Sequence, residues 1–236
     1  MKNILLTGFQ PFGGLTDNPS ARIVYVMDGA VINRHRVVAH TLPVTFKDAP
    51  VILERLLVQF EPKLVMCLGL AVGEEVIRLE RQAINQVDFR IADNAGQIVK
   101  GPVVQGGPQS YQSKLPLDSI REALHRHHIP ARISNCAGTF VCNALMYSAL
   151  NLCTREDDYT ACGFIHLPCL PEQTRDVRTT DCQFPDVKAD SSAFVGMDGT
   201  VGNTAVSRSQ SLPPSMSLAQ QIESVRLAIS VSLENL

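Results

Sequence analysis

Apolar runs and segments of helical period alternate along most of this chain. Residues 4–7 form a short apolar run that ends in a Gly- and Pro-rich loop, which predicts a buried strand. Apolar residues then recur at helical spacing between residues 47 and 60, ahead of Pro62. The whole pattern predicts strands at 4–7, 36–42, 63–68, 131–134 and 161–167, helices at 18–28, 47–60, 117–128, 139–152 and 218–233, and a β-like stretch at 74–92.

The order of these elements indicates the fold class. Strands that alternate with helices are typical of α/β proteins with a largely parallel sheet. We therefore expect a single-domain, three-layer α/β/α fold around a mostly parallel, mixed and twisted sheet. A chain of 236 residues fits one such domain over residues 1–236, and it can bury about 70% of its unfolded surface without a disulfide or metal.

Residues 174–214 follow a different pattern. They are rich in Ser, Thr, Asp and Gly, carry turn signals at 198–199 and 202–203, and show no sustained period. A segment of this length without elements of its own is uncommon inside a compact domain. We expect a mobile surface excursion here, outside the core.

Charge and composition narrow the classes of function. The chain has 21 Lys and Arg against 23 Asp and Glu, a net charge of −2. Nucleic acids and anionic membranes attract clustered positive charge, so we expect neither as a partner. No targeting segment is visible, and charges, Gly or Pro interrupt every apolar run before it reaches the length of a membrane span. These patterns predict a cytoplasmic protein with reduced thiols.

Cysteines and histidines give little indication of a metal site. The seven cysteines are an odd number and form no C-x-x-C pair. His125, His127 and His128 lie close together, but they fall at the end of a predicted helix, where the dipole alone favours basic groups. We therefore expect no metal site.

Cys142 is the first candidate for reactive chemistry. A strand ends near residue 134, Ala-Gly turns the chain at 137–138, and Cys142 falls in the first turn of the next helix. Unpaired backbone N–H groups at that position favour a thiolate of lowered pKa and can bind an oxyanion. The residues alone leave two alternatives open: Cys142 is a packed core thiol, or Cys136 in the preceding turn is the nucleophile.

Two other segments supply candidate partners for a cysteine. His166 ends an apolar strand shortly before Pro168, and in open α/β sheets such strand ends line the ligand crevice. A lone histidine there is more often structural, but beside a helix-N-terminal cysteine it indicates a Cys–His pair. Glu80 lies in an apolar, strand-like context, where a carboxylate needs a partner.

The partner of Glu80 stays open at this point. Glu80 can orient His166, or it can pair with one of three nearby arginines. Asp88 and Asp93 are equally open as the acid that orients the histidine. The residues in question are Arg78, Arg81, Arg90, Asp88 and Asp93.

Several motifs, in one order and at proper spacing, carry a resemblance to a known family. They cover residues 1–173 and resume at 215–218. The motifs are Thr-Gly-Phe-Gln-Pro-Phe-Gly-Gly at 7–14 with Asn-Pro-Ser at 18–20, Glu-Arg-x-Ala-x-Asn at 80–85, Arg-Ile-x-Asp-Asn at 90–94, Ala-Gly-Thr-Phe-Val-Cys-Asn at 137–143, and Gly-Phe-Ile-His-x-Pro-x-x-Pro-Glu-Gln at 163–173. On these motifs the chain resembles the pyrrolidone-carboxylate peptidases, the pyroglutamyl-peptidase I family of cysteine peptidases.

The resemblance implies an activity and a set of site residues. Members hydrolyse the N-terminal pyroglutamyl (5-oxoproline) residue from peptides through an acyl-enzyme, with a triad that falls on Glu80, Cys142 and His166. Arg90 matches the family's arginine beside the catalytic centre, and the amide of Cys142 would complete an oxyanion site. The implied substrate contacts are Phe9, Phe12, Asn18, Ile91, Phe140 and Val141, a mainly apolar set suited to a flat lactam ring. The resemblance also implies a homotetramer, and the expected chemistry requires no cofactor.

The loop after the third strand departs from the family pattern. The family usually has Gly-Gln-Ala-Gly-Gly-Arg where residues 69–74 read Gly-Leu-Ala-Val-Gly-Glu. Leu70 loses an amide, Val72 would be strained if its position needed positive φ, and Glu74 reverses a charge. Gln10 stands where Glu is common, and the excursion at 174–214 is longer than expected. These changes bear on substrate positioning or subunit contacts and leave the triad intact.

Three hypotheses about function follow. The first is a pyroglutamyl-peptidase, and the second is a diverged thiol amidase that keeps the triad but cleaves another amide. The third is an α/β ligand-binding protein without catalysis. The glycine loops contain neither G-x-G-x-x-G nor the P-loop lysine spacing, and the Cys, His and Glu are all retained, so the sequence favours the first.

Overall fold

A seven-stranded sheet forms the centre of the computed structural model, which describes residues 1–155, 160–174 and 214–236. The strand order is β10-β5-β11-β4-β1-β3-β2. Parallel pairs join β1 to β3 and β4, β4 to β11, and β5 to β10, whereas β5–β11 and β2–β3 are antiparallel. The predicted mostly parallel, mixed sheet is confirmed. The strands are β1 (Asn3–Phe9), β2 (Val31–Ile32), β3 (His35–Leu42), β4 (Leu64–Leu70), β5 (Ile77–Glu80), β10 (Ala131–Ser134) and β11 (Ala161–Leu167).

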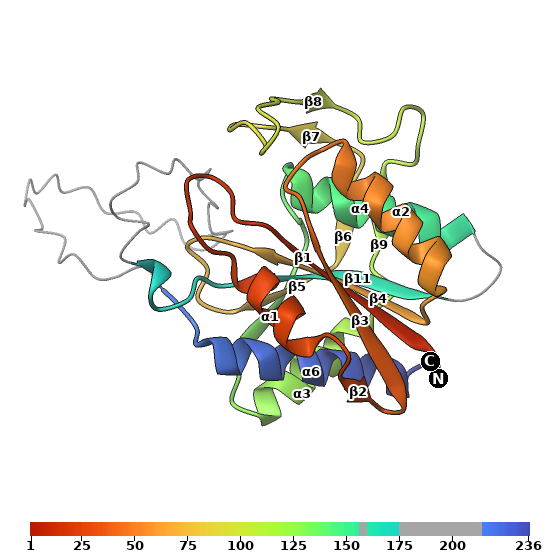
Figure 1. Cartoon of the computed structure of the whole chain (residues 1–236), viewed down its shortest axis with the longest axis vertical. Coiled ribbons are helices and arrows are strands. Elements are labelled where there is room, and N and C mark those ends of the chain that lie inside the picture. The colour runs from red at the N-terminus through yellow and green to blue at the C-terminus, as the bar shows by residue number, and fades with distance from the viewer. Residues whose placement is uncertain (156–159, 175–213) are drawn as a thin grey trace, which may run out of the picture.

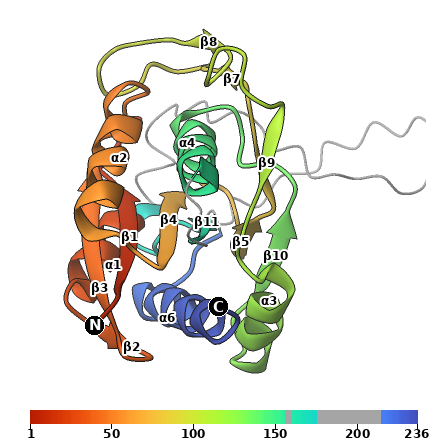
Figure 2. The ribbon, with the colours of Figure 1, turned by 90° about the vertical axis from the view of Figure 1, so that its right-hand side faces the viewer.

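Helices cover both faces of the sheet, as Figure 1 shows. One face packs against α1 (Pro19–Met27), α3 (Leu117–Arg126) and α6 (Leu218–Glu234), and the other against α2 (Asp48–Phe60) and α4 (Val141–Arg155). Figure 2 shows α2 and α4 on one side of the strands and α6 and α3 on the other. The three-layer α/β/α prediction is therefore confirmed.

Side-chain caps begin two of the helices where the sequence predicts a start. Asn18 accepts a hydrogen bond from the Ser20 amide, and Pro19 occupies the first turn of α1. Ser217 accepts from the Gln220 amide at the start of α6. Each cap satisfies a backbone N–H that has no partner within its helix, which fixes the first turn.

The β-like stretch at 74–92 proves to be three separate strands. After β5 come β6 (Gln82–Ile84) and β7 (Val87–Asp88), which pair with β9 (Ser110–Gln112) and β8 (Lys100–Gly101) in two small sheets. The sequence did not predict β2, β8 or β9. Strands of two or three residues are too short for a period to appear.

Two expectations concern other segments. Residues 175–213 of the predicted surface excursion lie outside the described residues. In the loop after β4, the positive φ of 86° falls on Gly73, and Val72 is free of the strain that the family pattern suggested. Among the helices that the structure describes, none is both long and apolar enough to cross a membrane.

Candidate active site

A buried acid–histidine pair lies at the carboxyl end of β11. Nδ1 of His166 is 2.8 Å from Oε1 of Glu80. The Glu80 side chain is fully buried and that of His166 is 7% exposed. With the imidazole neutral, Nδ1–H donates to the carboxylate, so Nε2 is left with a lone pair that can accept a proton.

Strand pairing explains why these two side chains meet. In the antiparallel pair β5–β11, Phe164 is opposite Glu80 and His166 is opposite Arg78. Alternate residues of a strand point to the same face, so all four side chains share the face covered by α4. Residues 86 apart in sequence thus become neighbours.

The structure shows which of the three candidate acids, Glu80, Asp88 and Asp93, contacts His166. Both oxygens of Asp93 accept backbone N–H groups, from Ala95 and Gln97 at one oxygen and from Phe46 at the other. Asp88 pairs with Lys100 at 3.3 Å on the surface. These two carboxylates therefore organise loops, and Glu80 is the acid that contacts His166.

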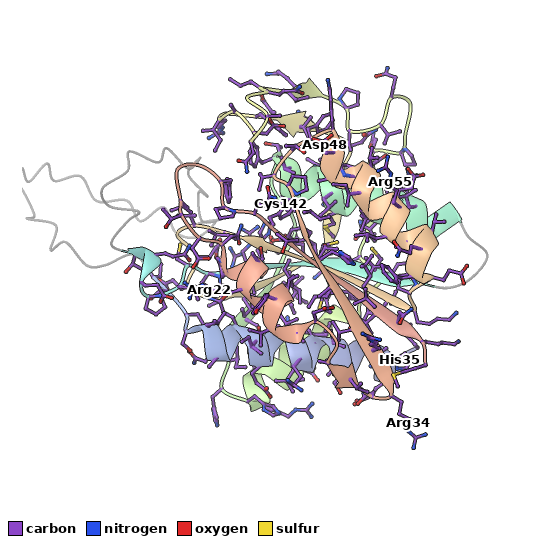
Figure 3. The ribbon with its side chains drawn as sticks, viewed as in Figure 1. Arg22, Arg34, His35, Asp48, Arg55 and Cys142 are labelled. Atoms are coloured by element: carbon purple, nitrogen blue, oxygen red, sulfur yellow. The ribbon has the colours of Figure 1, made fainter. Side chains whose placement is uncertain are left out.

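Cys142 lies in the first turn of α4, as predicted, near the centre of the molecule (Figure 3). A methyl group built on Gly69 would be 3.0 Å from the Cys142 sulfur, so the thiol packs directly on the backbone of β4. Gly69 is the register partner of His166 in the parallel pair β4–β11. The thiol therefore occupies the strand position beside the histidine, on the face that carries Glu80.

The expected lowering of the Cys142 pKa is not found. Burial raises the pKa of the thiol to about 12, and the negative charge of Glu80 acts in the same direction. The positive charge of Arg78 and the Cys142 backbone amide oppose this but are outweighed. The position at the helix N-terminus does not by itself keep the thiol ionised, since desolvation disfavours the thiolate more strongly than the helix N-terminus favours it. Ionisation of this thiol needs a base that takes its proton.

The Glu80 carboxylate, in contrast, stays ionised. Burial acts to raise its pKa, but the hydrogen bond and charge of His166 and the charge of Arg78 outweigh burial. The pKa of Glu80 therefore lies below the ordinary value of a glutamate. An ionised acid beside Nδ1 fixes the tautomer of His166 and stabilises the imidazolium once it forms.

Cys136, the rival nucleophile, has a different environment. It lies exposed in the turn between β10 and α4, where its sulfur accepts from the Gly138 amide at 3.3 Å. Its carbonyl oxygen accepts from Arg78. Cys142, in contrast, packs on Gly69 beside the strand position of His166, so the geometry favours Cys142.

From the sequence, Arg78 was expected only as one possible partner of Glu80. In the structure, Arg78 is a central residue of the site. Its Nη2 is 3.0 Å from Oε1 of Glu80, and its Nη1 is 3.0 Å from Glu74. Glu74 in turn pairs with Arg132 at 2.9 Å. The charge reversal at residue 74 is therefore compensated within this chain. Arg78 and Glu80 are two positions apart in one strand, and in the sequence this spacing already indicates that their side chains share a face.

Aromatic rings lie just before Cys142 in the chain. Phe140 packs on Phe12 with centroids 6.0 Å apart and on Phe89 at 4.5 Å. Phe89 also contacts Phe46 edge-on at 6.0 Å. Phe12 and Phe140 are only partly buried, so they can present an apolar wall. Phe89 was not expected from the sequence.

The other residues expected at the substrate have varied surroundings. Phe9 and Val141 are 2% and 1% exposed within the core on the α4 side. Asn18 is fully buried, accepting from Ser20 and donating to the Gln10 carbonyl, so it holds the loop after β1. Ile91 is partly exposed, and Arg90 is exposed with no hydrogen bond or ion pair to the described residues.

The histidines near the end of α3 have structural contacts. A ring nitrogen of His125 is 2.9 Å from the Ala131 carbonyl oxygen. His127 caps α3, and His128 adopts a left-handed φ of 57° in the following turn. Within the described part of the chain, no group of three or more His, Cys, Asp or Glu side chains has the arrangement of a metal site.

Comparisons with known proteins identify the family of this chain and agree with its fold. The family model for pyroglutamyl peptidase matches residues 2–194. A pyrrolidone-carboxylate peptidase from Pyrococcus furiosus is 37% identical over 234 residues, 99% of each chain. One from Bacillus cereus is 41% identical over 174 residues, 73% of this chain and 81% of that relative. The crystal structure of pyrrolidone carboxyl peptidase from P. furiosus has a TM-score of 0.84 at 36% identity and covers 99% of both chains. This chain belongs to the pyroglutamyl peptidase family.

Proposed function

We propose that this protein is a cysteine peptidase that removes the N-terminal pyroglutamyl residue from peptides, with Cys142 as nucleophile, His166 as base and acid, and Glu80 as the group that orients His166. The observation that carries the proposal is the 2.8 Å contact between Glu80 and His166, beside the strand position on which the Cys142 sulfur packs. The family membership and the relatives' names support the substrate class.

The first half of the reaction follows from the raised thiol pKa. Nε2 of His166 takes the proton of the Cys142 thiol as the sulfur attacks the pyroglutamyl carbonyl carbon. The carbonyl oxygen becomes an oxyanion, and backbone N–H groups in the first turn of α4 are suited to stabilise it. The imidazolium then gives its proton to the leaving amine as the C–N bond breaks.

The second half regenerates the enzyme. Water attacks the thioester as His166 Nε2 removes one of its protons, and the C–S bond breaks. The proton returns to the Cys142 sulfur, and free pyroglutamate leaves. Glu80 stays ionised throughout, because its role is to hold Nδ1–H and to stabilise the imidazolium.

The residues around α4 support an apolar site for the lactam ring. Phe12 and Phe140 are partly exposed and adjacent, and we assign them the walls of the ring pocket. Phe9 and Val141 support these walls from the core, and Asn18 fixes the loop that carries Phe12. Arg90 and Ile91 follow Phe89 in the chain and are assigned to the side of the site next to Phe140.

Turnover of a fluorogenic pyroglutamyl amide tests the proposal. Wild-type protein should release the fluorophore, and Cys142→Ala should abolish release while the far-ultraviolet circular dichroism stays that of a folded protein. The matched control is Cys136→Ser, whose exposed thiol should change turnover by no more than about twofold. Turnover of a prolyl or alanyl amide with none of the pyroglutamyl amide would instead identify a thiol amidase of other specificity.

The setting of the enzyme is also part of the proposal. We assign it to the cytoplasm, where the six cysteines that the structure describes as free would stay reduced. We further assign it a single peptidase domain and a homo-oligomeric, tetrameric state, as the resemblance to the family implies. Light scattering during size-exclusion chromatography measures the oligomer mass directly, and a monomer would contradict the last assignment.

A further inference from the structure

One carboxylate oxygen at the candidate active site is shared by two cationic or potentially cationic groups. Oε1 of Glu80 is 2.8 Å from Nδ1 of His166 and 3.0 Å from Nη2 of Arg78. The other oxygen, Oε2, is buried without a hydrogen-bond partner among the described residues. The two groups therefore divide the charge of a single oxygen between them.

Arg78 is held in this position from several directions. Its Nη2 also donates to the Ser134 hydroxyl at 2.8 Å and to the Cys136 carbonyl at 2.7 Å. Its Nη1 donates to Glu74, and the side chain is 9% exposed. The planar fork of an arginine can serve two carboxylates at once, which a single lysine ammonium does not match.

These contacts form a charged row: Arg132, Glu74, Arg78, Glu80 and His166. Signs alternate along the row from the half-exposed Arg132 to the buried histidine. Opposite charges at this separation, away from solvent, interact strongly enough to shift proton equilibria. The row thus connects the loop after β4 electrostatically to the candidate catalytic pair.

We propose that Arg78 is a positioning residue that sets the pH range in which Cys142 and His166 react, because it shares the Glu80 carboxylate with His166. The inference rests on the proposed function only for the roles of Cys142 and His166. A guanidinium at Glu80 offsets part of the negative charge that favours the neutral thiol of Cys142. Glu74 weakens this effect, because it offsets part of the charge of Arg78.

The direction of each effect follows from the groups that face the pair. Removing Arg78 leaves Glu80 uncompensated, so the pKa of Cys142, already raised by burial and by Glu80, rises further. Removing the charge of Glu74 has the opposite sign. The titratable or charged groups around Cys142 and His166 come from five segments of the fold. They are Arg78 and Glu80 on β5, Glu74 in the loop before β5, Arg132 on β10, Cys67 on β4, and Cys142 itself on α4.

Alkylation of Cys142 by iodoacetamide tests the inference without any peptide substrate. The rate constant is followed for the Cys142 peptide by mass spectrometry across a range of pH, in wild type, Arg78→Met, Arg78→Lys and Glu74→Gln. The matched control is Arg121→Met, which removes an exposed arginine that pairs with Asp118 on α3. Circular dichroism checks that each variant is folded.

Opposite displacements of the rate–pH curve are the expected result. Arg78→Met should move the curve to higher pH by about one unit, so that alkylation is about tenfold slower at any pH below its plateau. Glu74→Gln should move it to lower pH by a smaller amount. Arg78→Lys should recover at least half of the Arg78→Met displacement, because it keeps the charge, and Arg121→Met should leave the curve in place.

Three outcomes would overturn the inference. If the rate–pH curves of Arg78→Met and Glu74→Gln coincide with that of wild type, Arg78 has no influence on the reactivity of Cys142 and His166. Displacement of both curves in the same direction would indicate disturbed packing instead of charge. If Arg78→Met does not fold, a Glu74→Gln curve that does not move to lower pH decides against the proposal.

Two further measurements, pyroglutamyl turnover and alkylation of His166→Ala, distinguish this inference from the proposed function. Absence of pyroglutamyl turnover together with opposed displacements would contradict the proposed substrate and leave the role of Arg78 intact. Alkylation of Cys142 that is unchanged by His166→Ala would contradict the catalytic pair itself.

Discussion

The two faces of the central sheet use the same strands for different purposes. On β5, Ile77 and Leu79 point into the core under α1, α3 and α6, whereas Arg78 and Glu80 point to the face under α4. On β11, Ile165 likewise belongs to the first face and His166 to the second.

The difference shows how one strand can supply stability and chemistry together. The first face is almost purely aliphatic, so it contributes through apolar burial. The second face also has an apolar core, but along β5 and β11 it buries a charged row, which costs desolvation and contributes little net stability. Neighbouring residues of one strand should therefore differ in mutagenesis: changes on the second face should lower activity far more than changes on the first, which should lower stability alone.

The largest effect is expected from His166→Ala. Loss of the group that takes and returns the proton should lower kcat/KM for a pyroglutamyl amide by about 10³-fold. The free energy of unfolding should also fall, because the variant leaves the buried Glu80 carboxylate with Arg78 as its charge partner, but the variant should stay folded at assay temperature. Steady-state kinetics and urea unfolding measure the two quantities. A variant that is inactive only because it is unfolded at assay temperature would contradict the separation of the faces.

Ile165→Ala, at the neighbouring position, should lower the stability of the protein and leave its activity largely unchanged. Ile165 is 1% exposed in the aliphatic core, and truncation there should lower the free energy of unfolding by about 3 kcal/mol. The folded fraction should keep kcat/KM within a few-fold of wild type. Urea unfolding gives the stability, and active-site titration corrects kinetics for folded protein. A 100-fold loss of kcat/KM per folded molecule would show that the two faces are coupled.

A smaller effect is expected from Gly69→Ala, where the chain approaches the candidate nucleophile. The added methyl group would lie 3.0 Å from the Cys142 sulfur and 2.8 Å from Cζ of the Phe164 ring, both too close without a shift. We expect kcat/KM to fall about tenfold and the free energy of unfolding by about 1–3 kcal/mol. Kinetics and unfolding at one temperature test this. Wild-type kinetics would mean that the thiol position tolerates displacement.

The smallest effect concerns the pH dependence of stability. The folded-state pKa of Glu80 lies below its ordinary value because His166 and Arg78 outweigh burial. Its contribution to stability is therefore present above that ordinary value and is lost as the pH falls through the folded-state pKa. Urea unfolding at neutral pH and near pH 4 should show that the free energy of unfolding falls more steeply with decreasing pH for wild type than for Glu80→Gln. Equal slopes would contradict the assigned direction.

Much of the fold and part of the site are predictable from the residue pattern. The long elements all form close to their predicted bounds, because strands of seven or eight residues and helices of nine or more carry a clear period. Cys142 is found in the first turn of a helix, and His166 near the end of a strand, as predicted. The short strands β2, β8 and β9 carry no such signal, and the expected lowering of the Cys142 pKa was wrong because helix position says nothing about desolvation.

The sequence by itself determined the family, through the resemblance of its motifs. It also determined the layer architecture and the two segments that carry Cys142 and His166, since these depend on local order and period. The residues alone left Glu80, Asp88 and Asp93 open as the acid beside His166, and the resemblance pointed to Glu80. Only the tertiary structure decided that Glu80 contacts His166 and that Arg78 shares the same oxygen. That choice depends on the antiparallel register of β5 against β11, set between residues 86 apart. Local pattern fixes which face a side chain occupies, whereas the pairing of distant strands fixes which side chain it meets.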